Sequence, residues 1–232
     1  MRSTSCTILA YNEEKTLEEA TRQVHDALAA RGGYFEIIIA DDGSTDATAE
    51  IGLELEEKLR GVRLLRHGRN LGPGSGILTG IRNARCDNIC FHPADQQVDF
   101  AEVAAALPLL EDNDVVVFSR SGRPGYTPLR RLASGVYIGL AHALFGLREF
   151  DDFNFVHMWR RELVQDMPLL SDGVFMCTEI LVRAVDRGAR VARAEAECKP
   201  RTVGATAVFK SRVISKTFGE MFGFWRARRN GG

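Results

Sequence analysis

Acidic and hydroxyl side chains gathered on one short segment are the clearest candidates for chemistry in this sequence. The apolar run 36–40 ends abruptly in Asp41-Asp42-Gly43-Ser44-Thr45-Asp46. Such a run predicts a buried strand that delivers these polar groups to one point at its carboxyl end. In open α/β sheets, ligands bind at that edge. Capping of a following helix would explain Ser44-Thr45-Asp46, but two adjacent acids before the glycine exceed what capping needs. We therefore favour a ligand-binding role.

The segments around this motif alternate between strand and helix patterns. We expect strands at 6–10, 35–40, 62–65 and 88–92 and helices at 12–30, 46–59 and 77–84. This order predicts a parallel sheet with right-handed crossovers. Beyond residue 100 we expect helices at 100–110, 130–147, 178–187 and 208–229, with strands at 115–119, 155–158 and 190–197. The pattern indicates one continuous α/β domain, with one ligand in each half.

Polar groups follow other predicted strands at the same edge of the sheet. Tyr11-Asn12-Glu13-Glu14 comes after the first strand, where helix initiation explains Asn12 and the acids but not Tyr11. The glycine-rich segment 70–76 is typical either of a phosphate-cradling loop before a helix or of a flexible turn. Asp95 and Gln97 follow strand 88–92 and could coordinate a hard divalent cation that carries phosphate oxygens. The alternative is an ordinary polar loop.

Together these segments resemble a known family in order and spacing. The resemblance is to the family 2 glycosyltransferases with the GT-A fold, in the polyprenyl-phosphate mannosyl- and glucosyltransferase branch, and it rests on 11–13, 39–46, 69–72 and 94–97. Weaker downstream matches are 115–120, 152–155, Glu179 and 199–204, so the likeness covers about 6–206. It implies a GT-A domain over 1–207, with a nucleotide-sugar half (about 1–100) and an acceptor half (101–207), followed by a basic amphipathic helix at 208–232.

The resemblance implies a cation and a set of donor-binding residues. Mg²⁺ or Mn²⁺ on Asp95 and Gln97 would bridge the leaving diphosphate, and Arg201 would add positive charge. The family normally has Asp-x-Asp at the metal motif, whereas this chain has Pro93 at the first position, which should lower the metal affinity. The implied nucleotide-sugar-binding residues are Tyr11, Asn12, Glu13, Asp41, Asp42, Ser44, Asn70, Gly72, Ala94 and Asp95.

The acceptor decides whether a catalytic base is needed. A lipid phosphate is already an anion, whereas a hydroxyl needs a carboxylate within hydrogen-bond reach. Candidate bases are Asp151, Asp152 and Glu179, each of which is also explained as a surface acid or ion-pair partner. Candidate phosphate-binding residues are Arg123, Arg130 and Arg131, for which a solvated basic face is the alternative. With Asp95 and Arg201, whose roles the resemblance implies, the predicted catalytic set is Asp95, Asp152, Glu179 and Arg201.

These inferences predict an inverting glycosyltransferase. It would move a sugar such as mannose or glucose from a GDP- or UDP-linked donor to a polyprenyl phosphate. Two alternatives stay open: the same donor chemistry on a soluble acceptor, such as a natural product or a polysaccharide precursor, and a non-catalytic nucleotide-sugar-binding protein, suggested by Pro93.

Composition limits the classes of binding partner and the cellular compartments that are expected. A net charge of −1 provides no global field that would recruit nucleic acid. No apolar run approaches the ~20 residues of a membrane span, and five scattered cysteines indicate a reducing compartment. The tail 208–229 mixes bulky apolar with basic side chains, which is typical of an interfacial membrane helix or of a helix packed on the domain or a partner. We expect a cytoplasmic protein, peripheral on the inner face of the membrane.

Overall fold

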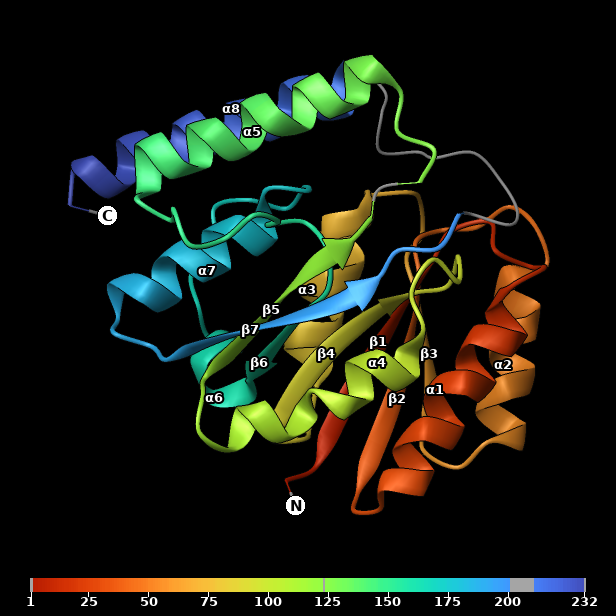
Figure 1. Ribbon diagram of the computed structural model, residues 1–232. Helices are drawn as coiled ribbons and strands as arrows, with labels where there is room; N and C mark the ends of the chain where they lie inside the picture. Colours follow the sequence, from red (N-terminus) through yellow and green to blue (C-terminus); the bar gives the residue numbers. More distant parts are fainter. Residues whose placement is uncertain (1, 123, 201–210, 232) are drawn as a thin grey trace.

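A seven-stranded, mostly parallel sheet organises the chain. The computed structural model (Figure 1) describes residues 2–122, 124–200 and 211–231. The strands lie in the order β3-β2-β1-β4-β6-β5-β7. Their bounds are β1 Thr4–Ala10, β2 Phe35–Asp41, β3 Val62–Arg66, β4 Asn88–Pro93, β5 Val115–Ser121, β6 His157–Arg160 and β7 Val191–Glu197. Only β6 runs against its neighbours β4 and β5 in this part of the chain. The predicted α/β class is confirmed.

Helices cover both faces of the sheet and complete two apolar cores. One core receives α1 (Leu17–Arg31), α2 (Thr48–Lys58), α4 (Phe100–Ala105) and the 3₁₀ helix η1 (Leu107–Glu111). The other receives α3 (Pro73–Asn83), α5 (Pro128–Phe145), α7 (Met176–Asp186) and α8 (Ser211–Arg229), and α6 (Arg161–Val164) follows β6. Because both faces are covered, the central strands carry continuous apolar runs, as β2 does with Ile37, Ile38 and Ile39, each fully buried.

Parallel pairing brings the motifs of the first half to one edge. β1 lies between β2 and β4, so Ala10 is level with Asp41 and Leu9 is level with Pro93. The segments that follow these three strands therefore meet at the carboxyl edge of the sheet, as the sequence predicts.

Several predicted element boundaries are wrong. The helix expected from residue 12 begins at Leu17, because Asn12 adopts a left-handed φ of 55° and bonds to the neighbouring loop. The helix expected from 77 begins at Pro73, a residue whose missing N–H suits the first helical turn. The helix expected over 100–110 divides into α4 and η1. The strand expected at 155–158 lies at His157–Arg160.

Helices α5 and α8 lie alongside each other on the face of the sheet that α7 covers, with α7 between them and the strands in the view of Figure 1. Met221 and Phe224 of α8 are buried in the second core, and Phe218 and Trp225 pack against it. Of the two alternatives for the tail, packing on the domain is the arrangement seen from residue 211 onward. None of the described helices combines the length and the apolar character that crossing a membrane requires.

Candidate active site

Asp42 anchors the loop that precedes α3. Its carboxylate accepts hydrogen bonds from the backbone N–H groups of Leu71 (2.9 Å) and Gly72 (2.8 Å) and lies 2.8 Å from Nδ1 of His67. The side chain of Asp42 is only 9% exposed. Its two oxygens are therefore engaged inside the protein, which fits a role in shaping the loop. The amides of Leu71 and Gly72 that a phosphate-cradling loop would offer are directed to this carboxylate.

Asp41 and Gly43 form the tight end of β2. Asp41 is fully buried, and its Oδ1 accepts from the backbone N–H of Ser44 at 3.0 Å. Its Oδ2 lies 3.2 Å from Nε of Arg66. Gly43 has φ 72°, and a Cβ there would lie 2.5 Å from the backbone carbonyl carbon of Arg69. Glycine is required at this position because of both its backbone conformation and the close approach of the next loop.

The loops after β1 and β2 are hydrogen-bonded to each other. The N–H of Asn12 donates to Oγ of Ser44, and Oδ1 of Asn12 accepts from the N–H of Thr45, both at 2.9 Å. The N–H of Glu13 donates to the hydroxyl of Thr48 at 2.9 Å. Tyr11 precedes these contacts and is 38% exposed. The predicted donor-side residues are thus brought together, with an aromatic ring left on the surface beside them.

The turn after β4 carries Asp95 and Gln97. Ala94 is buried and donates its N–H to the carbonyl of Leu9, which ties the turn to β1. The N–H of Gln97 donates to Oδ1 of Asp95 at 3.2 Å. The side-chain amide of Gln97 donates to the carbonyl of Lys199 at 3.3 Å, so this turn is also joined to the segment that follows β7.

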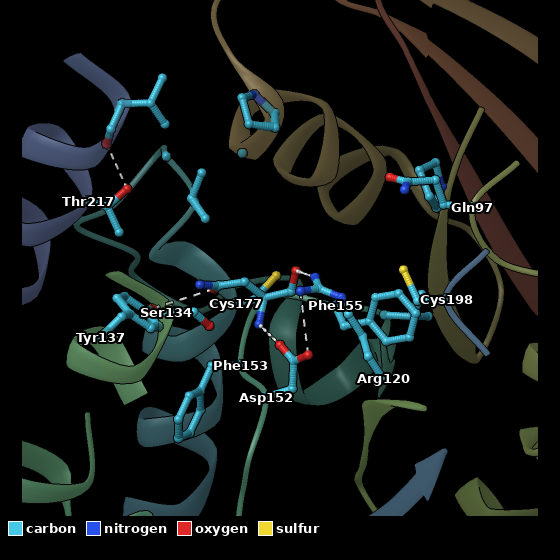
Figure 2. Close-up of a pocket in the computed structure, with 18 of the residues that line it drawn as sticks. Gln97, Arg120, Ser134, Tyr137, Asp152, Phe153, Phe155, Cys177, Cys198 and Thr217 are labelled. Carbon is cyan, nitrogen blue, oxygen red and sulfur yellow. Dashed lines mark hydrogen bonds and ion pairs between the residues drawn. The ribbon is translucent and has the colours of Figure 1, made fainter. Parts of the chain in front are cut away.

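A cavity of about 370 Å³ joins this turn to the second half of the chain. Asp95 and Gln97 line one side of it, and Arg120 at the end of β5 lines another. Tyr126, in the connection between β5 and α5, also lines the cavity, as do residues of α5, α7 and α8, among them Arg130, Ser134, Tyr137, Cys177 and Thr217. Figure 2 shows Gln97 and Thr217 on opposite sides, with Arg120 and Asp152 between them in this view.

Arg120 is held by several groups around the cavity. Its guanidinium donates to the hydroxyl of Tyr126 and to the carbonyl of Asn154, both at 2.8 Å. Nη1 of Arg120 lies 3.5 Å from Oδ2 of Asp152, and the Arg120 Cζ atom is 4.6 Å from the ring centroid of Phe155. This network fixes a positive charge at the cavity wall. In Figure 2 the carboxylate of Asp152 points toward Arg120.

Two predicted acids have different surroundings. Asp152 lines the cavity and is buried beside Arg120. Glu179 is fully buried in α7, and its oxygens accept from the N–H groups of Leu170 and Ser171 (both 2.9 Å) and from Nε of Arg183 (2.8 Å). Glu179 is absent from the residues that line the cavity. Its geometry fits anchorage of the 170–171 turn, and the base role predicted for it has no geometric support.

Two thiols face the cavity but are not activated. Burial raises the pKa of Cys177 to about 12, and burial is also the largest cause that raises the pKa of Cys198. Both are therefore neutral near pH 7 and lack the thiolate that nucleophilic chemistry needs.

A divalent cation would depend on few protein ligands here. No cluster of three or more His, Cys, Asp or Glu side chains suited to a metal occurs among the described residues. Asp95 and Gln97 both face the cavity and offer oxygen ligands. That donor set fits Mg²⁺ or Mn²⁺, hard cations that proteins often hold with one or two carboxylates plus phosphate oxygens of the substrate.

The site also contains residues to which the sequence assigned no role. Arg120, Tyr126 and Ser134 line the cavity. Of these three, only Arg120 could have been singled out from the sequence, because it lies at the end of a predicted strand. Arg201 and Arg123 lie outside the described residues.

Comparison with known proteins places the chain in a family. The family described as Glycosyl transferase family 2 matches residues 5–186. The chain belongs to this family. Among curated family 2 relatives, a dolichol-phosphate mannosyltransferase of Pyrococcus furiosus is 27% identical over 93% of this chain and 60% of its own length. An undecaprenyl-phosphate 4-deoxy-4-formamido-L-arabinose transferase of Edwardsiella ictaluri is 30% identical over 70% of this chain and 50% of its own. The predicted polyprenyl-phosphate branch is confirmed as the source of similar sequences, and the chain spans at most about 60% of the length of these relatives.

A solved structure confirms the GT-A fold predicted for this family 2 chain. Glucosyl-3-phosphoglycerate synthase of Mycobacterium tuberculosis, in complex with Mn²⁺, UDP and glucosyl-3-phosphoglycerate, superimposes with a TM-score of 0.75 and 20% identity. The likeness covers 97% of this chain and 80% of the synthase.

Proposed function

We propose that this chain transfers a sugar, such as mannose or glucose, from a GDP- or UDP-sugar to the phosphate of a polyprenyl acceptor, with inversion at the anomeric carbon. The observation that carries the acceptor class is the pair Arg120 and Arg130 in the same cavity as Asp95 and Gln97. Guanidinium groups suit phosphate oxygens in charge and geometry.

The acids near the cavity favour an acceptor that is already anionic. Asp152 is the one residue of the proposed base set (Asp151, Asp152 and Glu179) that lines the cavity, and Arg120 lies beside it. A phosphate oxygen attacks the anomeric carbon without losing a proton, so a free carboxylate base is unnecessary. The new bond joins that oxygen to the sugar, and the bond to the diphosphate breaks as the nucleoside diphosphate leaves.

On the donor side we assign roles by position at the sheet edge. Tyr11 would contact the base, and Asn70 and Gly72 would form the rim of the same site. The buried Asp41 and Ser44 would shape the nucleoside side of it through their contacts with each other and with Arg66 and Asn12, while Asp42 holds the 71–72 loop in place. Asp95 and Gln97 would hold a divalent cation, which supplies positive charge to the leaving diphosphate when bound.

The apolar face of α5 supports a position at a membrane surface. Leu129, Leu132 and Val136 recur at helical spacing and are 65%, 66% and 48% exposed. Exposed basic residues also occur on α5 and α8: Arg131, Arg212, Lys216, Arg226 and Arg229. An exposed apolar stripe on a helix pair that also carries exposed basic side chains suits the surface of an anionic bilayer. We propose peripheral association with such a surface at the cytoplasmic face.

A soluble phosphate-bearing acceptor is the second candidate. The structural likeness to an enzyme named for 3-phosphoglycerate favours it, since the same arginine pair would suit either phosphate. The test compares undecaprenyl phosphate in detergent with 3-phosphoglycerate, using GDP- and UDP-sugars with Mn²⁺, and measures release of nucleoside diphosphate and sugar transfer. Transfer to the lipid but not to the soluble phosphate supports the proposal.

Two results would overturn the proposed function. Transfer only to neutral hydroxyl acceptors would remove the phosphate requirement. Binding of a nucleotide sugar without diphosphate release with any acceptor would indicate a binding protein. Asp95→Asn is expected to lower the rate at limiting Mn²⁺ with the thermal midpoint retained, and Asp26→Asn, at a side chain 82% exposed on α1, is the matched control.

A further inference from the structure

Tyr126 contacts both arginines of the cavity. It lies in the short connection between β5 and α5, after Gly122 and Gly125, which have φ 89° and 73°. Its hydroxyl accepts from Nη1 of Arg120 at 2.8 Å. Its ring lies 3.9 Å from the Cζ atom of Arg130. One phenol therefore contacts one guanidinium through its oxygen and the other through its face.

Two cations at one wall of a cavity repel each other unless other groups offset the charge. The nearest carboxylate oxygen of Asp152 lies 3.5 Å from Nη1 of Arg120 and offsets part of the charge of that arginine. The negative face of an aromatic ring attracts a guanidinium without neutralising it. The arrangement keeps both positive charges available to an anion in the cavity.

We propose that Tyr126 is a positioning residue that sets the spacing of Arg120 and Arg130 for the phosphate of the acceptor. The inference rests on the proposed function, because it names the group that organises the acceptor end of that same site. Tyr126 acts through the two arginines and takes no part in bond making or breaking.

The test uses Tyr126→Phe, which removes the hydroxyl and keeps the ring, and Tyr126→Leu, which removes both contacts. Binding of farnesyl phosphate and of farnesol is measured by calorimetry in detergent without donor, so that no turnover occurs. We expect Tyr126→Phe to weaken farnesyl phosphate binding about tenfold, since a hydrogen bond to a charged group is lost. Tyr126→Leu should weaken it about fivefold further through loss of the cation–π contact. Farnesol binding and the KM for the donor should not change.

Tyr34→Phe is the matched control, because Tyr34 is 67% exposed and precedes β2. It should bind farnesyl phosphate as the wild type does, and the thermal midpoint of Tyr126→Phe should equal that of this control. Unchanged farnesyl phosphate affinity in Tyr126→Phe, or an equal loss for farnesol, overturns the role of Tyr126. If the wild type itself binds farnesyl phosphate no better than farnesol, the phosphate acceptor of the proposed function fails instead.

Discussion

The substitution Asp42→Asn tests whether this acid supports the loop before α3. The carboxylate of Asp42 receives two backbone N–H groups and a ring nitrogen of His67 at 2.8–2.9 Å. Asparagine keeps one acceptor oxygen and turns an N–H₂ group toward the remaining donors. Each donor left unsatisfied costs about 1–3 kcal/mol where it is buried. Leu71 is exposed and Gly72 half-buried, so solvent relieves part of the loss. We expect a loss of about 2–4 kcal/mol, or about 4–16 °C in Tm for a chain of this size.

The assay is urea unfolding of the ligand-free protein, followed by tryptophan fluorescence, to which Trp225 of α8 and the fully buried Trp159 contribute. The midpoint should fall with the slope unchanged. Asp26→Asn should stay within about 0.5 kcal/mol of the wild type. A nucleotide contact at Asp42 predicts the opposite pattern, with normal stability and weaker UDP or GDP binding. A ligand-free midpoint equal to that of Asp26→Asn, with nucleotide affinity lost, would refute the anchoring role.

Three further predictions concern pH, Glu179 and the membrane face. Burial lowers the pKa of His92 and of His157 from 6.5 to about 4, so both side chains are neutral in the folded protein. The free energy of unfolding is therefore highest above pH 6.5 and falls as the pH drops toward 4. At pH 5 each histidine should have lowered it by about 2 kcal/mol. Urea midpoints at pH 7.5 and 5 check this, and a double Gln variant with an undiminished pH slope would contradict it. Glu179→Gln should destabilise by about 2–3 kcal/mol and leave the pH–rate profile unmoved, with Glu162→Gln as control; a shifted profile would restore the base role. Leu132→Ser should reduce co-sedimentation with phosphatidylglycerol vesicles several-fold while Leu109→Ser does not, and equal binding by both would argue against α5 as the docking face.

The donor half of the site is predictable because its residues are local to strand ends. An apolar run followed by acids and a glycine defines both the buried strand and the edge at which it stops, and parallel pairing then brings Asp41, Asn12 and Asp95 to that edge. The sequence could not show which atoms of these residues remain available to a ligand. Asp42 is an acid at the same strand end as Asp41, yet its oxygens accept hydrogen bonds from the backbone N–H groups of the 71–72 loop. Because these hydrogen bonds join residues about 30 positions apart, no short sequence pattern around Asp42 indicates them.

The acceptor half was harder to predict because its residues meet only through tertiary packing. Arg120 ends a strand, Tyr126 lies in a connection and Arg130 is in the first turns of α5, with no periodicity that links them. Asp152 and Glu179 were equal candidates by residue type, and both are buried, but their partners differ: the oxygens of Glu179 accept from the 170–171 turn and Arg183, whereas Asp152 lines the cavity. Two acids that are equally good base candidates in the sequence are thus told apart by their hydrogen-bond partners in the structure. The anionic acceptor that we propose fits these surroundings. Asp152, the predicted base that lines the cavity, lies 3.5 Å from Arg120, and Glu179 is paired with Arg183, whereas a phosphate acceptor needs no base.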